Sequence, residues 1–273
     1  MSTYKILASD LDGTLLNSKG DVSDENLKAV AELVHRGALF VPSSGRTFSE
    51  IPENIRENPD IRYVIHSSGA VVYDKLTGQR ISFCIPKELS SIVFDLLSQY
   101  ECHITLRQKG RTLVNGKKMN KITCEYNQVW DIHYELIDKL AVRIDDFDKQ
   151  VREMEDIEMI SVFFHNDADI DRAKERIEAT GKLIAAKACP HNIEISYIEA
   201  GKGNALAALA DKLGISILET VAVGDSANDL PMILEAGLGL AMKNASAEVK
   251  AAANETVCNN DEHVVEYILS KYF

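Results

Sequence analysis

The chain has 273 residues, of which 45% are hydrophobic and 26% charged, and its formal net charge is −12 at pH 7. This length suits two domains, and the acidic balance argues against a nucleic-acid partner, because binding to a phosphate backbone requires a cationic surface. No apolar stretch approaches the ~18 residues of a membrane span, and the N-terminal residues lack signal-peptide features, so we expect a cytoplasmic protein without a membrane partner. The five cysteines are scattered without C-x-x-C spacing, which favours reduced thiols over a zinc or redox site.

The first and last thirds of the chain alternate between short apolar runs and helical patterns. In the first third we expect strands over residues 4–9, 38–42 and 63–66, a helix from an N-cap at Ser23 to about residue 36, and a helix-like stretch over 47–56. In the last third we expect a helix over 202–213, a strand over 220–223, a helix over 229–236, a strand over 238–242 and two further helices. This alternation predicts an α/β fold with a doubly wound parallel sheet.

The middle of the chain has a different pattern, in which strands and helices no longer alternate regularly. Its expected strands cover residues 103–106, 112–114, 140–144, 159–164 and 183–188. We interpret residues 82–189 as an inserted α+β domain and residues 1–81 and 190–273 as the core domain. The core sheet is then expected to resume near Asn192.

Two carboxylates follow the first expected strand. Asp10 and Asp12 are two residues apart, so both side chains point to the same side of an extended chain. Two close carboxylates are costly unless a cation lies between them or one is protonated, and either outcome suits a nucleophile paired with a general acid and base. The alternative, from these residues alone, is an acidic turn that caps the next element.

Two further segments offer groups that could bind an anion. Ser44 and Gly45 follow the second strand just before a helical stretch, where a hydroxyl and free backbone amides form a natural anion site. Lys202 begins a helix between two glycines, and because a cation is unfavourable at a helix N-terminus, we expect an anionic group near it. In isolation, Ser44 could equally be a plain N-cap and Lys202 a solvated lysine.

Oxygen-bearing side chains are concentrated after the strand at 220–223. Asp225, Asn228 and Asp229 fall within five residues, and such a set suits Mg²⁺, which prefers oxygen ligands. A polar loop with a helix cap is the alternative. All four segments fall at expected strand ends or helix starts, where the carboxyl edge of a parallel sheet holds its active site.

In order and spacing, these four segments resemble the motifs of the haloacid dehalogenase (HAD) superfamily. The matching residues are 10–14 (DLDGT), 44–46 (SGR), Lys202 and 224–229 (GDSAND). The insertion between the second and third motifs is similar to that of the Cof-type branch, which has a C2B cap. The resemblance implies a catalytic HAD core domain and an inserted cap that determines substrate specificity.

The resemblance also implies a mechanism. Asp10 would be the nucleophile that forms an aspartyl-phosphate, and Asp12 the general acid and base. The residues implied to hold the phosphoryl oxygens are Ser44, Gly45, Lys202 and Asn228. The implied ligands of Mg²⁺ are Asp10, the backbone carbonyl of Asp12 and Asp225, with Asp229 in a supporting role.

The chain departs from the family pattern at several positions. Ser44 stands where threonine is common, Ser68 where relatives often have asparagine, and His263 where they usually have glycine. The expected cap also contains a basic strip without acidic residues, comprising Arg107, Lys109, Arg111, Lys117, Lys118 and Lys121. This strip is either a solvated hairpin or a cationic surface for an anionic substrate.

The function that we predict is a Mg²⁺-dependent phosphatase that hydrolyses a small phosphorylated metabolite, with a sugar phosphate as the leading substrate class. A phosphomutase or phosphotransferase acting on a sugar phosphate is the nearest alternative. A non-catalytic metabolite-binding protein on the same fold is the alternative from another class, although a binding protein does not need a nucleophile paired with an acid.

Overall fold

The computed structural model describes residues 4–117 and 139–273, and the chain divides into two compact units. Unit 1 comprises Met1–Arg46, Ile51–Ile81 and Ala200–Phe273, and unit 2 comprises Thr47–Glu50 and Ser82–Glu199. Each unit is described separately below. Among the described helices, none has the length and apolarity needed to cross a bilayer.

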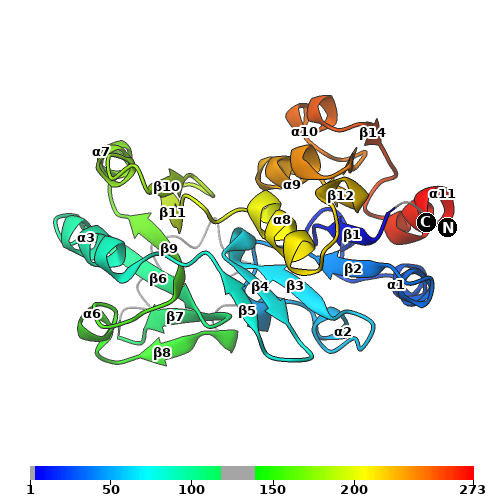
Figure 1. The fold of residues 1–273 in the computed structure, drawn as a ribbon. Helices are drawn as coiled ribbons and strands as arrows, with labels where there is room; N and C mark the ends of the chain where they lie inside the picture. Colours follow the sequence, from blue (N-terminus) through cyan, green and yellow to red (C-terminus); the bar gives the residue numbers. More distant parts are fainter. Residues whose placement is uncertain (1–3, 118–138) are drawn as a thin grey trace. The chain divides into compact units, whose positions relative to one another are not determined.

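The centre of unit 1 is a five-stranded parallel sheet (Figure 1). Its strand order is β14-β13-β12-β1-β2, with bounds Glu255–Thr256, Leu238–Ala241, Thr220–Gly224, Ile6–Ser9 and Leu39–Pro42. The strands β1 and β12 are buried along their whole length, as expected for parallel strands covered on both faces. The predicted α/β class with a parallel sheet is therefore confirmed.

A smaller antiparallel sheet adjoins β2. It contains β3 (Tyr63–His66), β4 (Val71–Asp74) and β5 (Arg80–Ser82) in that order. A parallel bridge between Ser43 and Ile65 joins β3 to the end of β2. The strand predicted at 63–66 thus exists, but its main partner is the hairpin strand β4.

Helices cover both faces of the parallel sheet, with α1 packed on α11 and α8 packed on α9 (Figure 1). Their bounds are Asp24–His35 for α1, Lys202–Lys212 for α8, Leu230–Glu235 for α9, Ala247–Ala252 for α10 and Val264–Tyr272 for α11. The helix α1 begins after Ser23, whose hydroxyl accepts a hydrogen bond from the backbone N–H of Asn26. This is the cap that the sequence predicts.

The helix-like stretch predicted over 47–56 is not continuous. A 3₁₀ turn covers Phe48–Glu50, and the short helix α2 covers Glu53–Arg56. Pro52 lies between them, and it disfavours the helical conformation at the preceding residue. The turn instead joins unit 2, because the Thr112 hydroxyl donates to the Glu50 carboxylate at 2.6 Å and the Ser49 amide donates to the Gly110 carbonyl at 2.9 Å.

Unit 2 is built on a six-stranded sheet with the order β10-β11-β9-β6-β7-β8. The bounds are Leu183–Ala186, Asn192–Tyr197, Ile157–Phe164, Cys102–Gln108, Arg111–Asn115 and Val142–Ile144. Asn192 begins β11, which pairs antiparallel with β9 and β10. The expectation that the core sheet resumes near Asn192 is therefore wrong, and unit 2 extends to Glu199.

The two faces of this sheet differ in chemistry. On one face, the aligned residues Leu106, Ile160 and Ile195 belong to a buried apolar cluster that includes residues of α3 (Lys87–Leu97) and α7 (Ala168–Glu178). On the other face, the cross-strand partners are Thr105, Ser161 and Glu194. Helices therefore cover the apolar face, while the opposite face carries these polar side chains beside the buried Met159 and Phe163.

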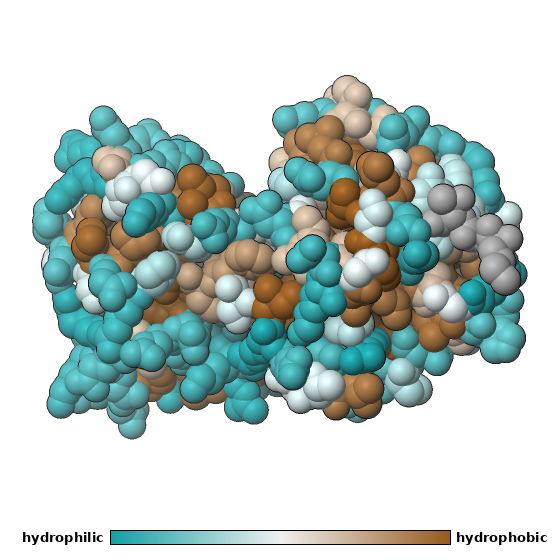
Figure 2. Space-filling view, viewed as in Figure 1, coloured by the Kyte–Doolittle hydropathy of each residue, from teal (hydrophilic) through white to brown (hydrophobic). Residues whose placement is uncertain are grey.

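The basic strip begins on the β6–β7 hairpin of unit 2. Arg107 is paired with Glu194 at 2.9 Å, so its charge is balanced within the sheet. Lys109 lies in the hairpin turn with a positive φ of 51°. Lys118 and Lys121 lie outside the described residues. Figure 2 shows the hydropathy of one face of the molecule, where apolar residues form several patches among the hydrophilic ones.

Candidate active site

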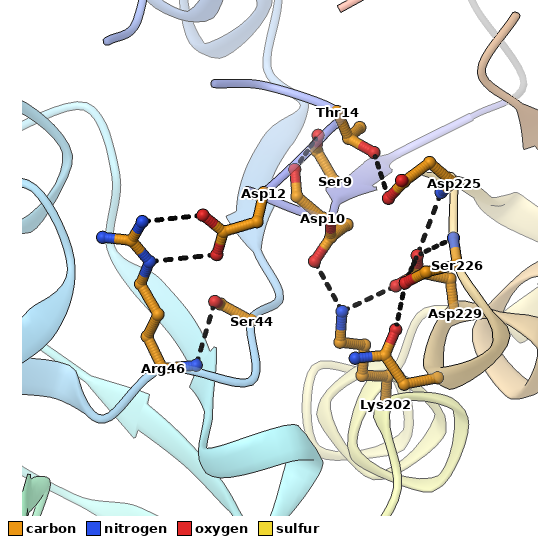
Figure 3. Close-up of polar contacts among 11 residues, drawn as sticks. Ser9, Asp10, Asp12, Thr14, Ser44, Arg46, Lys202, Asp225, Ser226 and Asp229 are labelled. Carbon is orange, nitrogen blue, oxygen red and sulfur yellow. Dashed lines mark hydrogen bonds and ion pairs between the residues drawn. The ribbon is translucent and has the colours of Figure 1, made fainter. Parts of the chain in front are cut away.

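Four polar side chains meet at the carboxyl edge of the parallel sheet (Figure 3). Asp10 follows β1, Ser44 lies two residues beyond β2, and Asp225 follows β12, while Lys202 is the first residue of α8. Parallel strands end at the same edge, so segments that are far apart in sequence converge there. All of these residues belong to unit 1.

Lys202 links two carboxylates in the interior of the site. Its Nζ donates to Oδ1 of Asp10 and to Oδ1 of Asp229, each at 2.6 Å. The exposed fractions of the three side chains are only 1%, 6% and 0%, respectively. A buried ammonium requires such partners. The second carboxylate oxygen of Asp10 has no hydrogen bond within the described part of the chain, so it is available to another group.

Asp229 also shapes the loop that carries Asp225. Its Oδ2 accepts hydrogen bonds from the backbone amides of Asp225 and Ser226, both at 3.0 Å. Both oxygens of Asp229 are therefore engaged by protein donors. Asp225 keeps a freer carboxylate, which the Thr14 hydroxyl contacts at 3.4 Å.

Burial and the charges of neighbouring groups both shift the pKa values of the residues in this cluster. Burial raises the pKa of Asp10 well above its ordinary value, with Lys202 opposing and the two neighbouring aspartates reinforcing that rise. Burial and repulsion from Asp229 raise the pKa of Asp225 to about 6. Burial alone would lower the pKa of Lys202, but attraction to Asp10 and Asp229 outweighs it and raises that pKa.

The carboxylate cluster fits a divalent cation. Among the described residues, Asp10, Asp225 and Asp229 each offer an oxygen, and these oxygens lie within 4.8 Å of one another. When all three carboxylates and the Lys202 ammonium are ionised, the cluster has a net charge of two negative units. Its possible ligand atoms are all oxygens, which Mg²⁺ prefers. Because Asp229 is engaged by Lys202 and two amides, Asp10 and Asp225 are the carboxylates best able to hold the ion.

Asp12 has a different environment from Asp10. Its side chain is 49% exposed and forms a bidentate pair with Arg46, with Nε donating to Oδ2 at 2.9 Å and Nη2 to Oδ1 at 2.6 Å. Figure 3 shows its carboxylate turned toward Arg46 and away from Lys202. The structure therefore separates the two aspartates: Asp10 lies in the buried cluster, and Asp12 lies at its edge.

The predicted anion-binding groups lie beside this cluster. The Ser44 hydroxyl accepts a hydrogen bond from the Arg46 amide at 3.1 Å, which leaves its own proton free to donate. Asn228 uses its carbonyl oxygen to accept from the Ser226 hydroxyl at 2.7 Å, so its amide nitrogen is available. A Cβ added to Gly45 would lie 4.0 Å from that nitrogen, so Asn228 and Gly45 are neighbours.

Two glycines permit the close packing of the site. A Cβ on Gly13 would lie 2.5 Å from Oδ2 of Asp225, and Gly13 has a positive φ of 78°. A Cβ on Gly224 would lie 2.4 Å from Cγ of Asp229. Both distances are far below normal contact, so a side chain at either position would displace a carboxylate of the cluster.

Two features of the site are not evident from the sequence. One is the pairing of Arg46 with Asp12, because the spacing of residues places Arg46 in the Ser44–Arg46 segment without specifying the direction of its side chain. The other is the turn Ser67–Gly69, which contacts the Ser44–Arg46 loop. Two serines adopt a positive φ there, and serine has no strong preference for that conformation that would have revealed the turn.

A parallel sheet whose carboxyl edge gathers three carboxylates, a buried lysine and the Ser44 hydroxyl belongs to an α/β protein suited to chemistry on an anionic ester. A family model for haloacid dehalogenase-like hydrolases matches residues 7–269, so the chain belongs to this family. The resemblance drawn from the four motifs is confirmed. So is the predicted enzyme class, a hydrolase acting on phosphoric monoesters.

Known proteins similar to the chain match it over nearly its whole length. Phosphatase YwpJ of Bacillus subtilis (strain 168) is 31% identical over 97% of this chain and 98% of its own. From the same organism, 5-amino-6-(5-phospho-D-ribitylamino)uracil phosphatase YcsE is 30% identical over 94% of this chain and 91% of its own. A solved structure of a haloacid dehalogenase-like hydrolase from B. subtilis has a TM-score of 0.78 and 29% identity, covering 98% of this chain and 100% of that one.

Proposed function

We propose that the chain is a Mg²⁺-dependent phosphatase that hydrolyses a small phosphorylated metabolite through an aspartyl-phosphate on Asp10. The observation that carries the proposal is the arrangement around Asp10. One of its oxygens is bonded to the buried Lys202, and the other has no hydrogen bond within the described residues. An ionised carboxylate oriented through one oxygen can attack phosphorus through the other.

The first step forms a bond between the free oxygen of Asp10 and phosphorus and breaks the bond to the leaving alcohol. Asp12 supplies the proton that the leaving oxygen needs. Because both oxygens of Asp12 accept hydrogen bonds from Arg46 in the resting enzyme, Asp12 must exchange this pair for the leaving group. Its exposure of 49% leaves room for that rotation.

The second step reverses the proton transfer. Asp12 takes a proton from water, the water oxygen attacks phosphorus, and the acyl-phosphate bond to Asp10 breaks, which releases inorganic phosphate and regenerates the carboxylate. Ser44, Lys202 and the amides of Gly45 and Asn228 hold the phosphoryl oxygens in this proposal.

Mg²⁺ would be held by the carboxylates of Asp10 and Asp225 and by the backbone carbonyl of Asp12, with Asp229 fixing the Asp225 loop. When bound, it would offset the negative charge of the phosphoryl group and of the carboxylate that approaches it. Burial, reinforced by repulsion between the neighbouring aspartates, raises the pKa values of Asp10 and Asp225, and this crowding of carboxylates supports a divalent cation at this place.

We propose that unit 2 selects the leaving group and that the substrate is a sugar phosphate or polyol phosphate. The polar face of its sheet supports this role, because Thr105, Ser161 and Glu194 offer both donors and acceptors for hydroxyl groups. The relative YcsE is named for a substrate with a phosphorylated ribityl group, which belongs to the same chemical class. A small phosphorylated metabolite of this kind is consistent with an enzyme that works in the cytoplasm.

The test is a panel of phosphorylated sugars, polyols and nucleotides incubated with the protein in Mg²⁺, with released phosphate as the readout. The matched control is Asp10→Asn, which preserves the shape of the side chain. The proposal expects phosphate release from sugar or polyol phosphates by the wild type and none by the variant. Conversion of a hexose phosphate to its isomer without free phosphate would indicate a phosphomutase, and binding without either reaction would indicate a metabolite-binding protein.

A further inference from the structure

The turn Ser67–Gly69 in unit 1 has an unusual backbone. Ser67, Ser68 and Gly69 have consecutive positive φ values of 52°, 55° and 89°. The left-handed conformation costs a residue with a side chain roughly 1–2 kcal/mol, so the two serines are strained. Such strain persists only where the surroundings impose it, and it is concentrated at ligand sites.

Two neighbouring elements impose this conformation. The Ser67 amide donates to the Arg46 carbonyl at 2.8 Å, and the Ser68 amide donates to the Ser44 carbonyl at 3.0 Å. On the other side, a Cβ on Gly69 would lie 2.2 Å from the backbone carbon of Gly201, which precedes Lys202. The turn is therefore wedged between the Ser44–Arg46 loop and the start of α8, the two elements that carry the proposed phosphoryl-binding groups.

The Ser68 hydroxyl lies beside Gly45. A Cβ added to Gly45 would contact Oγ of Ser68 at 3.4 Å and Nδ2 of Asn228 at 4.0 Å, so these two groups border the same space. Ser68 is partly exposed, and within residues 4–117 and 139–273 its hydroxyl has no hydrogen-bond partner. The strained turn thus presents a free donor next to a proposed phosphoryl-binding amide, whereas the neighbouring Ser67 hydroxyl is bonded to Nδ1 of the buried His66 at 3.1 Å.

We propose that Ser68 is a further substrate-binding residue, whose hydroxyl donates a hydrogen bond to an oxygen of the phosphoryl group beside Gly45. This inference rests on the proposed function, because it assigns a ligand to the same site. The left-handed backbone of Ser68 is the conformation that brings its hydroxyl to this position. The group recognised is the phosphoryl group itself, so the contact should be independent of the leaving alcohol.

The test measures the affinity for inorganic phosphate by calorimetry at a fixed Mg²⁺ concentration. Ser68→Ala removes the donor and keeps the strain, and it should weaken phosphate binding about 10-fold, as expected for a hydrogen bond to a charged group. Ser68→Asn should retain most of the affinity, because asparagine tolerates the left-handed conformation and supplies an amide donor. Ser68→Gly should bind as weakly as Ser68→Ala while its Tm rises by about 2 °C through release of strain.

The matched control is Asp156→Gly, at an exposed residue of unit 2 with a φ of 56°. It should raise Tm in the same way without changing the phosphate affinity. Wild-type affinity in Ser68→Ala, or equal losses in Ser68→Ala and Ser68→Asn, would overturn the inference, as would a wild type that does not bind phosphate. If the wild type releases phosphate from monoesters while Ser68→Ala binds phosphate normally, the role of Ser68 fails and the proposed function stands.

Discussion

Lys202 is bonded to Asp229 at the same distance as to Asp10, 2.6 Å, so one buried ammonium fixes two carboxylates. The two carboxylates differ in how they use their second oxygen. Within residues 4–117 and 139–273, one oxygen of Asp10 has no hydrogen bond, whereas Asp229 uses its other oxygen to accept from the amides of Asp225 and Ser226. Asp229 therefore joins the position of the lysine to the position of the loop that carries Asp225, the proposed metal-binding loop.

Asp229→Asn should impair both stability and turnover. Both oxygens of Asp229 accept hydrogen bonds, but the side-chain NH2 group of asparagine can only donate. In one orientation this group would face the Lys202 ammonium, and in the other it would face the backbone N–H groups of the loop, so one of the two sets of bonds must be lost. Removing one partner of a buried ion pair costs about 3 kcal/mol, and disturbing a residue that supports metal ligands lowers activity about 10–100-fold. Urea unfolding and steady-state kinetics would measure the two effects.

The control is Asp211→Asn, at an exposed position on α8. This variant should match the wild type in both measurements. Wild-type stability and kcat in Asp229→Asn would show that Lys202 and the Asp225 loop are positioned without Asp229.

Mg²⁺ should be required for turnover and should stabilise the fold. We expect chelation to abolish activity, excess Mg²⁺ to restore it, and Mg²⁺ at 100 times its Kd to add about 2.7 kcal/mol to the free energy of unfolding, because the ion binds the folded state. Asp225→Asn should lose most of this stabilisation, since it removes the freest carboxylate of the cluster. Thermal melts with and without Mg²⁺ provide the measurement, and full turnover in excess chelator would contradict the metal assignment.

The pair of Asp74 and Arg62 predicts a pH dependence of stability outside the active site. Hydrogen bonds from Arg62 at 2.9 and 3.2 Å lower the pKa of Asp74 to about 2. A carboxyl whose pKa is lowered on folding stabilises the protein above its unfolded pKa of about 4, and this stabilisation disappears as the pH falls through the folded pKa. Because Arg62 is partly exposed, we expect a contribution of about 1 kcal/mol at neutral pH.

Asp74→Asn isolates this charge. Its side-chain oxygen can still accept the bond that the Leu76 amide donates to Oδ1 of Asp74, so the turn is preserved. Urea unfolding should show the variant less stable than the wild type at pH 7, with the difference shrinking between about pH 4 and pH 2. A difference that stays constant over this range would mean that the charge of Asp74 does not contribute.

Local patterns in the sequence predict the strands and the site segments well, because both depend on neighbouring residues. The apolar runs that form β1 and β12 lie next to their polar motifs, so the meeting of Asp10 and Asp225 follows from the parallel topology alone. The partner of a strand is a long-range property. The segment Asn192–Tyr197 has a clear strand pattern, but nothing within it indicates that it pairs with β9 and not with the core sheet.

The other differences between the sequence predictions and the structure have separate physical causes. The interruption of the predicted helix at Pro52 could have been predicted from the sequence, because proline disfavours the helical conformation at the residue before it. The pairing of Asp12 with Arg46 depends on the direction of two side chains from different strand ends, which residue spacing does not specify. The left-handed serines at 67 and 68 are imposed by backbone contacts with Arg46 and Ser44, so their own sequence carries no signal.

The two aspartates of the first motif should fail in different ways when each is replaced by asparagine. Asp10→Asn exchanges the attacking oxygen for an amide that cannot form the aspartyl-phosphate, so turnover of every substrate should be abolished. The protein should remain folded, because the asparagine oxygen can still accept the bond from Lys202, Asp229 still pairs with that lysine, and burial disfavours the ionised Asp10, as its raised pKa shows. Asp12→Asn keeps the nucleophile and removes a proton transfer that is typically worth ~10²–10⁴-fold in rate.

The defect of Asp12→Asn should therefore depend on the leaving group. It should be severe for an alkyl phosphate and milder in the first step for an activated aryl phosphate, whose leaving group departs without a proton. Hydrolysis of the acyl-phosphate would still lack its base, so rapid mixing with an aryl phosphate should give a burst of the phenol followed by slow turnover. Asp21→Asn, at an exposed position outside the site, serves as the control. Substantial activity in Asp10→Asn, or an equal first-step defect of Asp12→Asn with both kinds of substrate, would show that the roles assigned to these two residues are wrong.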